Sequence, residues 1–158
     1  MNQTYIEIMI QSLRRKMQVL NQIIEANIRQ EEILRDNRTD IEEFDKTVEE
    51  KAALIEQMQQ LDSGFEKLYA RVEEELKGSK PDHVEEIKTM KSLIRTITDK
   101  SMEIQAQEAR NKELMIQRFT YVKDTAKVLR KNSKVATQYY KNMMNLNYVD
   151  PQFMDNKK

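Results

Sequence analysis

Apolar residues recur along the chain at alternating spacings of three and four, the period of helices that each bury one face. The longest such pattern runs from about residue 82 to residue 142. Its seam repeats every seven residues, as in a coiled coil, at Ile87, Ile94, Ser101, Glu108, Met115, Val122, Leu129 and Ala136. A second seam position lies three residues after the first four of these, at Met90, Ile97, Ile104 and Asn111. The pattern predicts one helix of about 60 residues, which is about 90 Å long.

Two shorter helical patterns precede this one. The first, at about residues 4–36, has its apolar stripe at Ile6, Met9, Ile10, Leu13, Met17, Leu20, Ile23, Ile24, Ile28 and Leu34. The second, at about residues 40–77, has its stripe at Ile41, Phe44, Val48, Leu54, Ile55, Met58, Leu61, Phe65, Leu68, Tyr69, Val72 and Leu76. Thr39 followed by Glu42 predicts a capping box at the start of the second helix. Gly64 lies inside its stripe and favours a kink or a close helix crossing there.

Gly78, Ser79, Lys80, Pro81 and Asp82 predict a loop, because Gly ends a helix and Pro begins the next. Pro81 or Asp82 is expected to open the last helix. After residue 142 the pattern fails, so residues 143–158 are expected to form a flexible tail. The predicted fold class is all-α, with three long antiparallel helices in a coiled-coil-like bundle and a single domain at residues 1–142.

The lengths of the three helices predict an overhang. If the chain turns back at Gly78–Pro81, residue i of the second helix lies near residue 160 minus i of the third, so cover ends near Thr120. Yet apolar side chains continue beyond this point, and an isolated helix of this length is marginal in water. The stripe is then a binding surface for another protein or a seam for self-association. The third possibility is that the helix boundaries differ from those predicted here, so that no overhang exists.

We expect the overhang and the start of the tail to bind a protein partner. The candidate contact residues are Tyr121, Val122, Leu129, Val135, Ala136, Tyr139, Tyr140, Met143 and Tyr148. Under the alternative hypothesis the chain is a structural coiled coil that assembles with itself. A homodimer is compatible with both hypotheses.

Composition agrees with long helices: the 158 residues include only 2 Gly and 2 Pro, and 34% of them are charged. The formal net charge is zero, but charge is uneven along the chain. Residues 36–79 hold 13 acidic and 6 basic side chains, and residues 109–148 hold 2 acidic and 9 basic ones. Because oppositely charged helices attract, this favours packing of the middle helix on the last.

The sequence offers little raw material for catalysis. It has no Cys and a single His, His83, which is expected to be a solvated residue in the first turn of the last helix. No Glu-x-x-His pair, phosphate-binding loop or nucleophilic triad is present. We therefore expect no enzyme activity, no metal and no cofactor.

Polar and basic side chains of the last helix each have two readings. Glu108 and Asn111 at seam positions form a polar layer that fixes register, or they hydrogen-bond a partner. The basic residues of the overhang are a solvated flank, or they bind nucleic acid or anionic lipid; they are Arg118, Lys123, Lys127, Arg130, Lys131, Lys134 and Lys141. We favour the first reading of each, so no nucleic acid is expected. No apolar run approaches the ~20 residues that span a bilayer, and no signal peptide is recognised, so we expect no membrane insertion and a cytoplasmic protein.

Three segments resemble the FlgN-like flagellar export chaperones. Residues 49–58 and 61–65 resemble the middle helix of that family, and residues 104–115, with Glu108 and Asn111, resemble the seam of its last helix. Residues 148–158 resemble the tail of its Gram-positive members. These motifs have low specificity, because helices rich in Glu, Lys and Leu resemble one another.

The resemblance implies a cytoplasmic chaperone that holds hook–filament junction proteins, also called hook-associated proteins, along its last helix. It also implies delivery of these clients to the membrane export gate, which reads a tyrosine in the C-terminal region. Tyr139, Tyr140 and Tyr148 are all candidates for that tyrosine. A related helical chaperone for another secretion client is the alternative within the same class.

Overall fold

The computed structural model describes residues 4–119, and helices dominate this part of the chain. In order, the elements are α1 (Tyr5–Arg35), α2 (Ile41–Ser63), α3 (Phe65–Leu76), the 3-10 helix η1 (Lys80–His83) and α4 (Val84–Phe119). No strand occurs within residues 4–119. The predicted all-α bundle is confirmed. The predicted overhang, the tail at 143–158 and the domain boundary at 142 lie outside the described residues and stay predictions.

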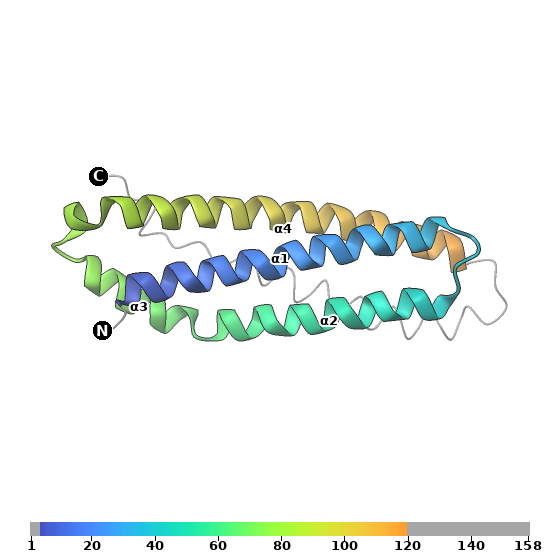
Figure 1. Cartoon of the computed structure of the whole chain (residues 1–158), viewed down its shortest axis with the longest axis horizontal. Helices are drawn as coiled ribbons and strands as arrows, with labels where there is room; N and C mark the ends of the chain where they lie inside the picture. The colour runs from blue at the N-terminus through green and yellow to red at the C-terminus, as the bar shows by residue number, and fades with distance from the viewer. Residues whose placement is uncertain (1–3, 120–158) are drawn as a thin grey trace.

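The helices form an elongated bundle in which α1 lies along both α4 and the α2–α3 pair (Figure 1). Helices α1 and α4 run in the same direction, and α2 and α3 run in the opposite one. Lys51 of α2 lies opposite Glu108 of α4, within one residue of the predicted register. The uneven charge favours packing of the middle helix on the last, but the most extensive contacts in the bundle are those between α1 and α4. Burial of apolar surface contributes more free energy than attraction between exposed charges, so it decides which helices pack together.

Each helix terminus has a local cause. Thr4 caps α1 by accepting a hydrogen bond from the Glu7 backbone N–H at 3.1 Å. The capping box predicted at Thr39 is wrong, since Asp40 caps α2 by accepting from the Glu43 N–H at 3.2 Å. The aspartate carboxylate is at least as good a cap as a threonine hydroxyl, so the helix begins one residue later.

The connection between α3 and α4 also departs from prediction in detail. Gly78 has a φ of 79°, a left-handed conformation that favours glycine and turns the chain after α3. Lys80–His83 then form the single 3-10 turn η1, with Pro81 near its start. The α-helix therefore begins at Val84, and not at Pro81 or Asp82 as expected.

Gly64 divides the predicted second helix into α2 and α3. Its φ of −98° and ψ of 4° depart from helical values for this one residue. A Cβ atom built there meets no atom within 4 Å, so the alternative of a close helix crossing is wrong. The break instead lets α3 pack separately on the N-terminal part of α1, where the Ile6 N–H donates to Glu75 Oε2 at 3.2 Å.

The buried apolar side chains form two separate clusters along the bundle. The larger, here called the proximal core, consists of Ile6, Met9, Leu13, Val19, Leu20, Ile23, Leu54, Ile55, Met58, Val72, Leu76, Met90, Ile97 and Ile104. The smaller, here called the distal cluster, lies beside the α1–α2 loop and consists of Leu34, Phe44 and Met115, with Ile33, Ile41, Val48 and Leu114 packed against it. The α4 seam predicted from the heptad repeat is thus confirmed up to Met115.

The two glycines make a matched pair of stability tests. Gly64→Ala should raise the free energy of unfolding by about 0.4–1 kcal/mol, because its φ is negative and its surroundings are open. Gly78→Ala should lower it by about 1–2 kcal/mol, because an L-residue is strained at positive φ. Urea denaturation of both variants measures the difference. A stabilising Gly78→Ala would contradict the turn geometry described above.

Candidate functional site

The nine candidate contact residues, at 121–148, lie outside the described residues. What the structure shows is the end of the bundle from which they follow. There α4 ends at Phe119, beside the loop that joins α1 to α2 (Figure 1). The geometry of this end decides which surfaces the following segment meets first.

Arg118 fixes the end of α4 to this corner of the bundle. Its guanidinium donates to the backbone carbonyls of Ile33 at 3.2 Å and Leu34 at 3.4 Å, and also to those of Asp36 and Thr39. The last carbonyls of a helix have no partner within the helix, and a cation near them also complements the helix dipole. The sequence places Arg118 in a solvated basic flank, but the structure shows it half-buried as a cap for α1.

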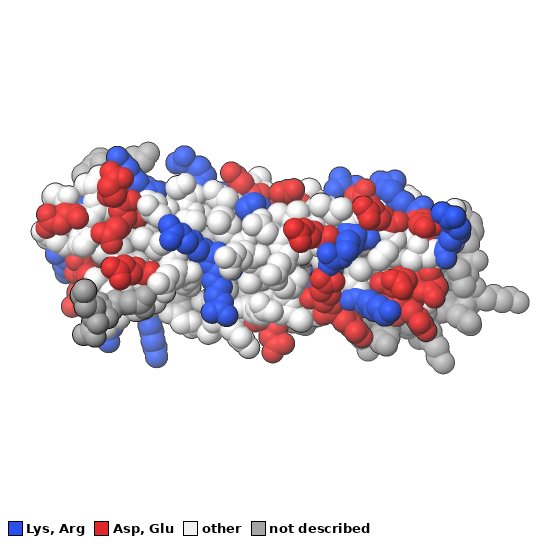
Figure 2. All heavy atoms as spheres, viewed as in Figure 1, with Lys and Arg blue, Asp and Glu red and all other residues white. Residues whose placement is uncertain are grey.

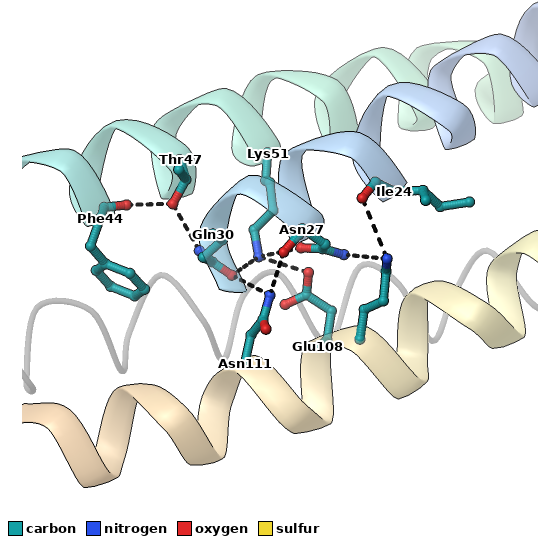
Figure 3. Close-up of polar contacts among 9 residues, drawn as sticks. Ile24, Asn27, Gln30, Phe44, Thr47, Lys51, Glu108 and Asn111 are labelled. Carbon is teal, nitrogen blue, oxygen red and sulfur yellow. Dashed lines mark hydrogen bonds and ion pairs between the residues drawn. The ribbon is translucent and has the colours of Figure 1, made fainter. Parts of the chain in front are cut away.

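Between the proximal core and the distal cluster, all three helices bury polar side chains. This polar layer consists of Asn27 and Gln30 from α1, Thr47 and Lys51 from α2, and Gln107, Glu108 and Asn111 from α4. Figure 3 shows how they point toward one another between the three helices. Burial of a polar group costs free energy unless the group is hydrogen-bonded. The stability of the layer therefore depends on how completely its polar groups are paired.

Lys51 is the centre of the layer. Its ammonium donates to Glu108 Oε1 at 2.7 Å and to Asn27 Oδ1 and Gln30 Oε1, both at 2.9 Å. An ammonium has three N–H donors, and these three acceptors use all of them. The side chains of Lys51 and Glu108 are only 5% and 4% exposed, so the pair is almost completely removed from water. Burial lowers the pKa of Lys51 from its ordinary value, while the Glu108 carboxylate acts in the opposite direction.

The amide side chains extend the layer across the helices. Gln30 Nε2 donates to Thr47 Oγ1 at 2.9 Å, and the Asn27 amide donates to Gln107 Oε1 at 3.1 Å. Asn111 Nδ2 donates to Gln30 Oε1 at 3.1 Å and to the Asn27 carbonyl at 3.0 Å. Asn111 Oδ1 is buried and has no hydrogen-bond partner in the described part of the chain. The register-fixing interpretation of Glu108 and Asn111 is supported, because their contacts lie inside the bundle.

Most of the layer escaped the sequence analysis, although the spacing carried a signal. Ile28 was assigned to the buried stripe of the first helix, but it is 49% exposed. The buried positions between Ile23 and Leu34 are instead Ala26, Asn27 and Gln30, and the two amides continue the alternation of four and three residues. Reading the stripe by spacing, irrespective of polarity, would have found both amides.

The remaining chemistry of the described part of the chain is sparse. His83 Nδ1 lies 2.9 Å from Glu86 Oε1, and this hydrogen bond raises the pKa of the imidazole. Within residues 4–119, no group of three or more His, Cys, Asp or Glu side chains could hold a metal ion. None of the helices described there is long and apolar enough to cross a membrane.

Comparison with known proteins defines the class. The family model of the FlgN protein matches residues 1–145. The chain therefore belongs to the FlgN family, whose members act as flagellar export chaperones. No curated protein and no solved structure matches it.

The buried ion pair gives a test of the polar layer. Glu108→Leu should lower the free energy of unfolding by about 3–5 kcal/mol, because it leaves the Lys51 ammonium buried without its carboxylate. Adding Lys51→Met should recover a large part of this loss, because no unpaired charge then remains. Urea denaturation of the two variants measures both steps.

The exposed pair of Arg29 and Glu50 provides the control. Both of these side chains are nearly half exposed, so Glu50→Leu should change stability by less than about 1 kcal/mol. Similar losses for Glu108→Leu and Glu50→Leu would show that Lys51 and Glu108 behave as a surface pair.

Proposed function

We propose that this chain is a cytoplasmic chaperone that binds hook-associated proteins through the segment at residues 120–148. It delivers these clients to the membrane export gate. The observation that carries the proposal is that the α4 seam reaches the end of the bundle at Arg118 while its heptad repeat continues in the sequence. Membership of the FlgN family supports the chaperone role in general; the client class and the gate are the finer steps of this proposal.

The described helices supply no further cover beyond this point. Helix α1 ends at Arg35 and α2 begins at Ile41, and both termini lie beside Arg118 through the contacts of the connecting loop. If α4 continued along the same axis after Phe119, Val122 and Leu129 would therefore have neither α1 nor α2 alongside them. Apolar side chains without cover are a binding surface for a partner.

The client recognised by such a seam is an amphipathic segment with apolar side chains at helical spacing. A helix that lays its apolar face against a complementary stripe uses anchors at three- and four-residue intervals. Val122, Leu129 and Ala136 provide one row of such anchors, and Tyr139 and Tyr140 flank its end. One tyrosine of this region, Tyr139, Tyr140 or Tyr148, would then be read by the export gate.

Self-association of the chain is the second candidate function, because the same stripe could pair with a copy of itself. A defined higher oligomer at all concentrations would favour it, and a stable monomer or dimer favours the chaperone. Nucleic acid is a weaker candidate. Figure 2 shows basic and acidic side chains interspersed over one face of the bundle, with an uncharged area in its middle. A polyanion finds no continuous basic field on this face.

Truncation after Thr120 should separate folding from binding. The truncated chain retains the proximal core, the polar layer, the distal cluster and Arg118, so it should fold with a circular dichroism spectrum dominated by helix. It should also lose client binding, because the whole proposed contact segment is missing. Unfolding of this variant would show that residues after 120 belong to the core; client binding equal to that of the full chain would place the contact elsewhere.

Two point variants separate apolar from electrostatic binding. Leu129→Asp should weaken client binding by more than a hundredfold, because a charge would be buried without a partner. Lys131→Ala should chiefly slow association and reduce its salt dependence, since exposed charges act at long range and are screened within about 8 Å. Isothermal titration with hook-associated proteins at two salt concentrations, together with stopped-flow association, measures these effects. Normal binding by Leu129→Asp with loss in Lys131→Ala would favour an anionic partner instead.

A further inference from the structure

We draw no further inference here: the strongest candidate, the surface patch of exposed apolar and small side chains on α4 at Met102, Ala106 and Ala109, carries no proposal because nothing in the described part of the chain shows what covers it.

Discussion

The register of the whole bundle depends on one buried ammonium group. The three N–H donors of Lys51 bond to acceptors on α1 and α4, which are Asn27, Gln30 and Glu108. All three acceptors can be reached only when the helices have the observed alignment. Sliding α4 by a heptad would place Ser101 or Met115 where Glu108 stands, and neither side chain offers a negative charge. Apolar seams of this kind tolerate such slips, because one Ile or Met resembles the next. The polar layer therefore supplies the specificity that the proximal core lacks, in the way that single polar seam residues fix alignment in coiled coils.

The same layer divides the bundle into a scaffold and an end. On one side, the fourteen buried apolar side chains of the proximal core hold α1, α2, α3 and α4 together. On the other side, the distal cluster and Arg118 join α4 to the corner between α1 and α2.

The sequence predicted the helices, their order and their register, and it did not predict which helices lie closest together. Spacing of apolar residues is a local signal, so it found α1, the described part of α4 and most of the apolar residues that each buries. The polar contacts between α1 and α4 join residues 79 to 85 positions apart, and no local pattern reports them. Asn27 and Lys51 were missed because polarity alone suggested solvent, whereas their place in the spacing indicated the core. Arg118 binds carbonyls at the end of α1 and in the α1–α2 loop, which are about 80 residues away in the sequence. Its role could therefore be recognised only from the fold.

The ion pair between Lys51 of α2 and Glu108 of α4 also bears on the order in which the bundle can form during synthesis. Lys51 and Glu108 are 57 residues apart, which takes a ribosome about 3–11 s at about 5–20 residues per second. During that interval a nascent hairpin of α1 and α2 has the ammonium and its two amide acceptors but no carboxylate, so it gains little by excluding water from them. The buried charge of Lys51 thus ties the complete packing of α1 and α2 to the synthesis of α4.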